Sequence, residues 1–501
     1  MNLNRKLALG SAALVISGLA LTGCGASGGS GDGAKDTVSW MAILHTPTTP
    51  EKGGAIEVAL EDLVGEDLNF QWIPDASKDE KLNAAIASDT LADIVSLPGV
   101  TNSTIRRSLS AGQFWDIEPY LSEFPNLAGI DPQIIEGAKI DGHLYGVPAQ
   151  KPKARFGVLV RQDWLDTLGL EVPHTTEEIA EVARAFTTQD PDGNGKNDTT
   201  GIVDRSESFD LTIRTLAGYF GAGSDFELNE DGEVVASFAT DAFVEAMEWF
   251  HDLYVDGAVT QEFVTVQKQN QQDAIAQGKG GIVVTGLFDA KNYMALAQSS
   301  NPDTPMSWAI VNDVTHADVP RRIVTDTNGG LGGWYAISKS SVKTEEDLKV
   351  VLGVLDKLLT EEGFGLMTNG IEGEHFEYGD DGAVTILDQT TWEQEVQPFS
   401  SSRLSETIKV FPSTTEYVNE ATEKMAENDE YTITNVAQSL TSDTFDSRWT
   451  EVLQQARDAY NKYMVGQLEL SDYEKLIDDL RAGDLGKIEA EFTASYDEVN
   501  G

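Results

Sequence analysis

Cysteine is almost missing from the chain, with Cys24 the only thiol among 501 residues. A single thiol forms no intramolecular disulfide and excludes a cysteine-rich metal site. Basic residues are also scarce, with 35 Lys and Arg against 83 Asp and Glu and a formal net charge of −48. A surface this acidic repels phosphate backbones and anionic lipid heads, which argues against binding to nucleic acid or to a membrane surface.

Known enzyme motifs are absent as well. The six histidines form no His-Glu-x-x-His motif, and no Gly-x-Ser-x-Gly, phosphate loop or dinucleotide fingerprint occurs. A glycosidase carboxylate pair stays open, because only the distance between two carboxylates is diagnostic. We therefore predict a protein that is not an enzyme, with a polysaccharide-degrading surface enzyme as the alternative.

The N-terminus carries a targeting signal. Arg5 and Lys6 precede an apolar stretch, Leu7–Leu21, which is shorter than the ~20 residues of a membrane span. Leu21-Thr22-Gly23-Cys24 then fits the bacterial lipobox, in which the cysteine thiol receives a diacylglycerol. We predict a lipoprotein signal peptide over residues 1–23 and lipidation of Cys24, with a plain secretory signal as the alternative.

A Gly/Ser-rich segment, Gly25–Lys35, follows the lipobox. Such a composition behaves as a flexible coil, so we predict a tether over residues 24–36 that holds the folded part outside the cell membrane. No later segment is apolar for ~18 residues, so the lipid is the expected membrane attachment.

The folded part begins with alternating strands and helices. Strands are predicted at Val38–Leu44, Leu68–Pro74 and Asp93–Leu97, and helices at Glu51–Val64 and Lys81–Ser88. This β-α-β-α-β order indicates a parallel sheet covered by helices. Ligands of such sheets bind beyond the carboxyl ends of the strands, here at His45–Pro50 and Leu97–Asn102.

The rest of the chain is also mixed α/β. Further strands are predicted at Gly280–Gly286 and Met306–Val311, and further helices at Thr176–Phe186, Ile202–Ala222, Thr240–Asp256, Leu287–Ala297, Glu345–Thr360, Tyr417–Asn428, Arg448–Met464 and Ser471–Arg481. A chain of this length is too long for one compact core, so two or more domains are expected.

The stretch Asp141–Gly169 places a polar spacer, Ala149–Arg155, between two apolar runs. We interpret it as the point where the chain leaves one lobe and enters another. Thr325–Ser338 is dense in glycine and then turns into a strand, so we take it as a second crossing. Ile408–Ser413 is the predicted third crossing.

Several stretches together resemble a known family. They are the lipobox, the tether, the β-α-β start, DGHLYGVPAQ, RQDWLDTLGLEVPHTTEEI and LMTNGIEGEHFEYGDDG. They look like extracellular solute-binding lipoproteins of ABC importers (sugar-binding family 1). Within it they are most similar to the long, calcium-containing subgroup of alginate- and fructo-oligosaccharide-binding proteins.

The resemblance implies a periplasmic-binding-protein-like α/β fold of type II. Its two lobes would be joined by three crossings, close on an oligosaccharide like a hinge, and dock as a monomer on a membrane permease. The expected lobes are residues 37–149 plus 326–407 and residues 150–325 plus 408–501.

One loop has the spacing of a cation site. Asp190, Asp192, Asn194 and Asp198 fall at the first, third, fifth and ninth positions of an EF-hand-like loop, and Lys196 offers a carbonyl at the seventh. Gly201 stands where the bidentate Glu belongs, and Thr199 stands where the family often has an acidic residue. We expect a structural calcium held by Asp190, Asp192, Asn194, Lys196, Asp198 and Thr199 and weakened by these departures, with a polar surface turn as the alternative.

Sugar sites combine flat aromatic rings with planar polar groups. Candidates at strand ends and crossings are His45, Gln150, Lys151, Arg155, Phe288, Asp289, Asn328, Trp334, Phe399 and Arg403. Trp334 is the preferred single candidate, with a core position as the alternative, and Lys151 and Arg155 could instead be solvated or form interlobe salt bridges. We expect Trp40, Trp72, Trp164, Trp249, Trp308, Trp392 and Trp449 to fill core or surface.

The acidic composition also bears on the sugar. It makes a polyanionic sugar such as alginate electrostatically less attractive, so a neutral oligosaccharide is expected. A local basic pocket of Lys151, Arg155 and Arg403 could override the net charge.

Overall fold

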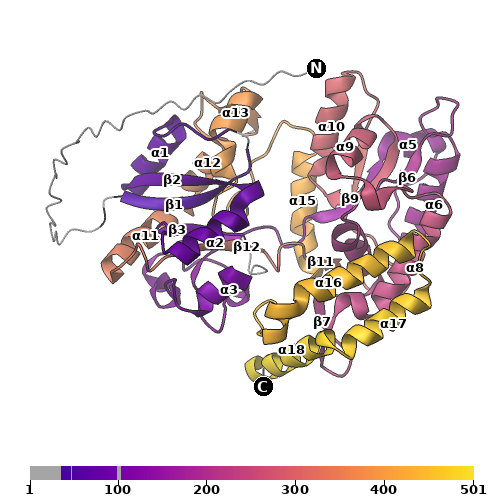
Figure 1. Ribbon diagram of the computed structural model, residues 1–501. Coiled ribbons are helices and arrows are strands. Elements are labelled where there is room, and N and C mark those ends of the chain that lie inside the picture. Colours follow the sequence, from indigo (N-terminus) through magenta and orange to yellow (C-terminus); the bar gives the residue numbers. More distant parts are fainter. Residues whose placement is uncertain (1–34, 36, 47, 99–102, 381, 501) are drawn as a thin grey trace, which may run out of the picture. The chain divides into compact units, whose positions relative to one another are not determined.

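The computed structural model describes residues 35–500 except 36, 47, 99–102 and 381 (Figure 1). The predicted signal peptide, Cys24 and nearly all of the predicted tether lie outside the described residues. Lys35, predicted to belong to the tether, forms an ion pair with the buried Asp93. None of the helices in the described part is long and apolar enough to cross a membrane.

The first sheet has the strand order β2-β1-β3-β12-β4. Its strands are β1 (Thr37–Leu44), β2 (Asp67–Pro74), β3 (Ile94–Leu97), β12 (Leu331–Ile337) and β4 (Gly146–Gln150). Strands β2 and β3 run parallel to β1, which confirms the predicted parallel start. Strand β12 is antiparallel to β3 and β4, so the sheet is mixed and the prediction of a parallel sheet is incomplete.

Helices cover both faces of this sheet. The chain moves from β1 outward to β2 through α1 (Ala55–Val64) and back to β3 through α2 (Lys78–Ser88). Right-handed crossovers in opposite directions place these two helices on opposite faces. Helix α1 packs beside α11 (Glu345–Leu358) and α12 (Glu361–Asn369), and α2 packs beside α3 (Ser103–Ser110) (Figure 1).

Helix α1 begins at Ala55, later than predicted. A turn precedes it, in which Gly54 N–H donates to Glu51 O at 3.1 Å. The helix then presents Ile56, Leu60 and Val64 to the core at the expected spacing.

The second sheet has the order β10-β5-β9-β6. Its strands are β10 (Trp308–Val311), β5 (Phe156–Arg161), β9 (Gly280–Gly286) and β6 (Thr200–Ile202). Strand β5 is antiparallel to β9 and β10, and β6 is parallel to β9. The predicted strand at Gly280–Gly286 has the observed bounds.

Helices from distant segments surround the second sheet. They include α6 (Thr176–Thr188), α7 (Arg214–Phe220), α8 (Asp241–Val255), α16 (Asp443–Met464), α17 (Leu470–Arg481) and α18 (Asp484–Asn500). Helix α16 packs against both α17 and α18 near the C-terminus (Figure 1). The sequence analysis did not predict α18.

The predicted helix Ile202–Ala222 is wrong in its first part. Strand β6 extends to Ile202, and regular α-helix starts only at Arg214 after a π-helical turn, Phe209–Ile213. The buried Asp204 carboxylate accepts hydrogen bonds from Ser208 and Thr212, which holds this segment in a non-α conformation.

The remaining elements are shorter or peripheral. They are α4 (Pro132–Gly137), α5 (Gln162–Leu168), α9 (Lys268–Ala276), α10 (Asp289–Ser300), α13 (Gln389–Glu395), α14 (Gln397–Ser400) and α15 (Val418–Asn428), with strands β7 (Phe226–Leu228), β8 (Val234–Ala236), β11 (Ile323–Val324), β13 (Phe376–Tyr378), β14 (Val384–Ile386) and β15 (Thr432–Ile433).

The buried apolar residues form separate cores around the two sheets. The first core draws on residues 38–149 and 331–404. The second draws on residues 158–314 and 421–492, in two adjacent clusters. The chain thus passes between the cores within residues 149–158, 314–331 and 404–421, which fits the α/β fold with two lobes.

Candidate functional site

The three passages between the cores lie hydrogen-bonded side by side. Gln150, at the end of β4, donates its N–H to Leu404 O at 2.8 Å, and its carbonyl accepts the Glu406 N–H at 2.8 Å. The next residue, Lys151, donates its N–H to Gly330 O at 2.8 Å. Residues from all three passages therefore meet at this edge of the first sheet.

Arg155 is held by a carboxylate from the second passage. Its Nη2 lies 2.7 Å from Asp326 Oδ2, and its Nε and backbone N–H donate to the same carboxylate. Asp326 is 3% exposed in its side chain, so this is a nearly buried salt bridge. Of the roles considered for Arg155, the structure shows the salt bridge.

The other cations at the passages are less tightly paired. Lys151 Nζ lies 3.6 Å from Glu406 Oε1, and Arg403 Nη2 lies 3.8 Å from the same oxygen. Both separations exceed hydrogen-bond distance. Lys151 and Arg403 thus share one carboxylate without being satisfied by it.

His45 follows β1 and lies close to this group. Burial lowers the pKa of His45; Asp75, 3.7 Å from its Nδ1, opposes the shift, and Lys78 and Lys151 lower the pKa further. His45 is therefore neutral at pH 7 and available as a hydrogen-bonding group.

Phe288 and Asp289 lie at the corresponding edge of the second sheet. Gly286, the last residue of β9, pairs with Phe156, and Leu287 N–H donates to Arg155 O at 2.9 Å. Asp289 then begins α10, where its two carboxylate oxygens accept hydrogen bonds from Thr285 and Asn292. Phe288 is half-buried against the second core.

An aromatic cavity of about 370 Å³ lies where the two cores approach each other. Two of the predicted ligand residues, Asn328 and Trp334, line it. Trp334 is 4% exposed, and its indole N–H donates to Ala138 O at 2.8 Å. The Trp334 ring is thus fixed in the wall of the cavity and also belongs to the first core.

The rest of the cavity wall comes from residues that the sequence analysis did not select. They are chiefly aromatic and amide side chains from the second core: Phe226, Phe238, Phe243, Asn435, Gln438, Phe445, Trp449 and Phe492. Trp449 was expected to fill core or surface, yet it lines the cavity. No short motif marks these residues, because they come from segments far apart in the chain.

Charged groups in this wall are paired internally. Arg106 pairs with Asp446 at 3.2 Å, Arg214 with Asp225 at 2.9 Å, and Asp210 with Arg457 at 2.7 Å. Paired charges leave the cavity with aromatic faces and amide groups as its main binding features. These are the features that fit the apolar faces and hydroxyl groups of a sugar.

Phe399 does not reach either group of residues. It is 2% exposed and packs edge-on against Phe70 and Trp72 within the first core. Phe399 therefore occupies a core position and not the predicted ligand contact. The sequence could not distinguish these two roles, because an aromatic residue after a polar segment has the same local pattern in both.

The predicted cation loop folds around its oxygen side chains. The Asp190 carboxylate accepts the N–H groups of Asn194 and Gly195, and the Asn194 amide donates to Asp192 and Asp198. Burial raises the pKa of Asp192; the Asn194 N–H opposes this, and Asp190 and Asp198 raise it further. These converging carboxylates fit a hard cation, which would relieve their repulsion.

The last two positions of the loop differ from an EF-hand. Thr199 is buried and donates its hydroxyl to Phe186 O at 2.7 Å, so that hydroxyl is engaged with α6. A Cβ on Gly201 would lie 2.2 Å from Ala183 O, so this position accommodates no side chain. Packing of β6 against α6 therefore explains the missing glutamate.

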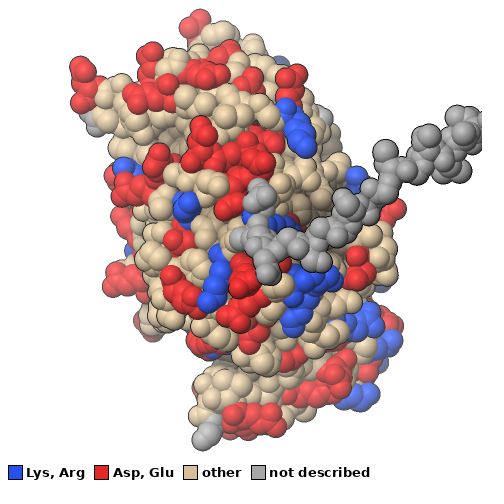
Figure 2. Space-filling view, turned by 90° about the vertical axis from the view of Figure 1, so that its left-hand side faces the viewer, with Lys and Arg blue, Asp and Glu red and all other residues tan. Residues whose placement is uncertain are grey.

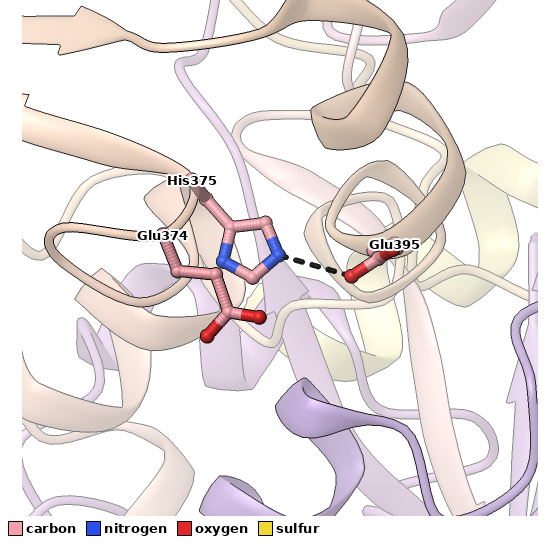
Figure 3. Close-up of side chains that lie close together, drawn as sticks. All are labelled: Glu374, His375 and Glu395. Atoms are coloured by element: carbon pink, nitrogen blue, oxygen red, sulfur yellow. Dashed lines mark hydrogen bonds and ion pairs between the residues drawn. The ribbon is translucent and has the colours of Figure 1, made fainter.

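A second group of metal-ligating residues consists of Glu374, His375 and Glu395, whose ligand atoms lie within 4.8 Å of one another (Figure 3). His375 Nδ1 accepts the Ile371 N–H at 3.1 Å, so its Nε2 carries the proton and donates to Glu395 at 3.3 Å. A metal-bound histidine instead donates from its second nitrogen. The histidine is therefore oriented for a structural hydrogen bond.

The chain is similar to known proteins over most of its length. A curated relative from Bacillus subtilis (strain 168), the polygalacturonan/rhamnogalacturonan-binding protein YtcQ, is 34% identical over 90% of this chain and 90% of its own. Another from the same organism, lipoprotein LipO, is 29% identical over 93% of this chain and 94% of its own.

Solved structures share the fold. A solute-binding protein of Bifidobacterium longum infantis described as HMO binding and ABC-transporter associated superposes with a TM-score of 0.71, at 18% identity over 92% of this chain and 99% of its own. The FusA substrate-binding protein of S. pneumoniae, solved as an EF-hand mutant with fructo-nystose, gives 0.67 at 18% identity over 92% and 99%.

Residues 46–363 match the family of bacterial extracellular solute-binding proteins. This match, with the similarity to YtcQ across the chain, confirms the predicted two-lobed fold and the prediction of a solute-binding protein rather than an enzyme. The chain belongs to the bacterial extracellular solute-binding protein family.

Proposed function

We propose that the protein is the receptor subunit of an ABC importer, which captures an oligosaccharide between two lobes and delivers it to a membrane permease. The aromatic cavity carries the proposal, because both cores line it and its charges are paired. Among the relatives, YtcQ is named a polygalacturonan/rhamnogalacturonan-binding protein, and FusA was solved with fructo-nystose. A carbohydrate ligand is what these relatives share.

The proposed mechanism is hinge closure. The proposed lobes are residues 37–149 plus 326–407 and residues 150–325 plus 408–501. Ile408 packs on the first core and Ser413 forms a β-bridge with Val384, which favours a boundary nearer Tyr417 than Ile408 within the third passage. A ligand that contacts both lobes favours the closed state by its differential affinity, and the permease would recognise that state. The receptor acts as a monomer, without nucleic acid.

We further propose that the protein is anchored on the outer face of the cell membrane through lipidated Cys24, after removal of residues 1–23. The lipobox supports this, as does the name of its relative, lipoprotein LipO. The tether between Cys24 and the first strand would let the receptor reach its permease.

A structural calcium is proposed in the loop of Asp190, Asp192, Asn194 and Asp198, with the Lys196 carbonyl. Converging carboxylates in the loop and the EF-hand in FusA support it. Because Gly201 and Thr199 contribute no carboxylate, affinity should be lower than in a complete EF-hand. The ion would tie the end of α6 to the start of β6 and take no part in sugar binding.

The direct test is isothermal titration calorimetry of the mature chain with a panel of oligosaccharides, followed by product analysis of each mixture. We expect saturable binding of at least one oligosaccharide, recovered intact. Absence of binding across the panel, or the appearance of cleavage products, would overturn the proposed function.

A further inference from the structure

Two acidic lobes repel each other when they close. The chain has 83 acidic and 35 basic residues, and the face in Figure 2 shows Asp and Glu spread widely, with Lys and Arg in smaller groups. Salt screens much of this repulsion but supplies no attraction in its place. Closure therefore depends on the ligand and on specific contacts between the lobes.

One segment of the second core reaches across to the first. It comprises residues 434–442, which connect β15 to α16, and we name it the interlobe segment. The Val436 N–H donates to Phe226 O at 3.3 Å, and the Thr441 N–H donates to Ser495 Oγ at 3.1 Å, so the segment is fixed to the second core at both ends. Four of its residues also line the aromatic cavity: Asn435, Ala437, Gln438 and Leu440.

Gln438 bonds the first core with its side chain. Its Nε2 donates to Gly137 O at 2.9 Å, at the end of α4. A backbone carbonyl can only accept, so the amide must present its nitrogen to Gly137. The other end of the amide, Oε1, accepts no hydrogen bond within the part of the chain that the structure describes. Gln438 therefore has one end bonded to the first core and one acceptor left over in the cavity wall.

The contact needs a glycine at position 137. A Cβ on Gly137 would lie 2.6 Å from Gln438 Nε2, which is too close for both to stay in place. The backbone itself makes no such demand, because Gly137 is the last residue of a helix and is not among the glycines with positive φ. The missing side chain thus serves the contact between the cores and not the local conformation.

We propose that Gln438 is the closure residue of the receptor. In the closed state its amide nitrogen holds Gly137 of the first lobe, and its amide oxygen accepts a hydroxyl group of the captured oligosaccharide. The inference rests on the proposed function. Because one amide makes both hydrogen bonds, the sugar and the contact between the lobes strengthen each other. The bond to Gly137 exists only when the lobes are together, so it slows release of the sugar and leaves its capture unchanged.

Stopped-flow fluorescence of the mature chain tests the inference, with the oligosaccharides of the calorimetry panel, including kestose, maltotriose and trigalacturonate, as probes. Gly137→Ala should speed release of a bound probe about two- to tenfold, as for the loss of one hydrogen bond, with the association rate unchanged. Its melting temperature should not fall, because alanine is favoured over glycine in a helix. Gly353→Ala in α11 is the matched control, since a Cβ there meets its nearest neighbour at 3.9 Å.

A double-mutant cycle separates closure from simple contact with the sugar. Gln438→Ala should speed release more than G137A does, because it removes both hydrogen bonds of the amide. In the Q438A background, G137A should have no further effect, since the added Cβ then has no amide to displace. If Gln438 contacted the sugar alone, G137A would leave release from the otherwise wild-type protein unchanged.

The outcomes distinguish the inference from the proposed function. If a probe binds and G137A releases it like the wild type, or if G137A speeds release equally with and without Gln438, the closure role is overturned while the receptor function stands. If no oligosaccharide of the panel binds, both fail.

Discussion

Arg106 of α3 reaches the second core, where its Nε lies 3.2 Å from Asp446 Oδ1 of α16. Its Nη2 also donates to Leu440 O at 3.1 Å, and the residue is 7% exposed. A nearby second link joins Gln438 Nε2 to Gly137 O at 2.9 Å. These bonds connect the two cores at the rim of the aromatic cavity.

Arg106→Gln should therefore weaken oligosaccharide binding, because it removes a contact between the cores. The pair is partly exposed on the Asp446 side, so the expected loss is about 1 kcal/mol, or about fivefold in affinity. Calorimetry measures it, with Arg448→Gln, which breaks exposed ion pairs within the second core, as the control. Equal losses in both variants would contradict the role of Arg106.

Calcium should raise the melting temperature of the protein, and EDTA should lower it. Binding to the folded state alone stabilises by about 2.7 kcal/mol at a hundredfold excess over Kd. Asp192→Asn should abolish the calcium effect with oligosaccharide affinity unchanged, whereas Asp231→Asn in another exposed turn should retain it. Differential scanning fluorimetry with calcium or magnesium measures the change in melting temperature for each variant. A response that survives D192N would place the ion elsewhere.

Trp449→Leu should reduce oligosaccharide affinity about two- to tenfold, since it keeps an apolar side chain but removes a ring from the cavity wall. Trp249→Leu is the matched control, because Trp249 packs near Phe220 in the second core and does not line the cavity. Calorimetry compares the two variants at temperatures where both are folded. Weaker oligosaccharide binding in W249L than in W449L would argue against the aromatic cavity as the binding site.

Local patterns in the sequence predicted most elements of the fold. The glycine-bounded apolar run Gly280–Gly286 is β9, and the periodic segment from Glu345 is α11. Such local patterns could not predict which strands from distant parts of the chain pair with each other. Strand β12 joins the first sheet between β3 and β4, although β4 ends at Gln150 and β12 begins only at Leu331. The hydrogen bonds that Asp204 accepts from Ser208 and Thr212 likewise hold the segment after Ile202 in a non-α conformation.

The residues of the candidate site also fall into those that local patterns could predict and those that they could not. Polar residues at the passages, such as Lys151 and Arg403, could be selected because crossings carry polar spacers between apolar runs. Trp449 and Gln438 could not, because only the packing of α16 and its preceding loop brings them to Trp334.

Asp93→Asn should destabilise the protein at neutral pH. Burial would raise the pKa of Asp93, but hydrogen bonds from Lys35 and Ser39 hold it below its ordinary value. A lowered pKa in the folded state stabilises the protein above the ordinary pKa, and this stability is lost as pH falls through the folded value. We expect a cost of about 1–3 kcal/mol at pH 7.

Urea unfolding at several pH values measures this effect. The difference between wild type and D93N should begin to shrink below about pH 4, where the Asp93 carboxylate is protonated in the unfolded chain, and should keep shrinking until pH falls through its lowered pKa in the folded state. Asp62→Asn, on the exposed face of α1, should show no comparable cost. A D93N penalty that is constant down to pH 3 would contradict the ion pair with Lys35 as its source.

The central claim is that the two lobes close on an oligosaccharide and leave its bonds intact. Small-angle X-ray scattering of the mature chain, with each sample assayed for sugar products, tests it most directly. We predict a smaller radius of gyration when a binding oligosaccharide is added, with the sugar recovered unchanged. An unaltered scattering profile at saturating ligand, or cleavage of the sugar, would contradict the account.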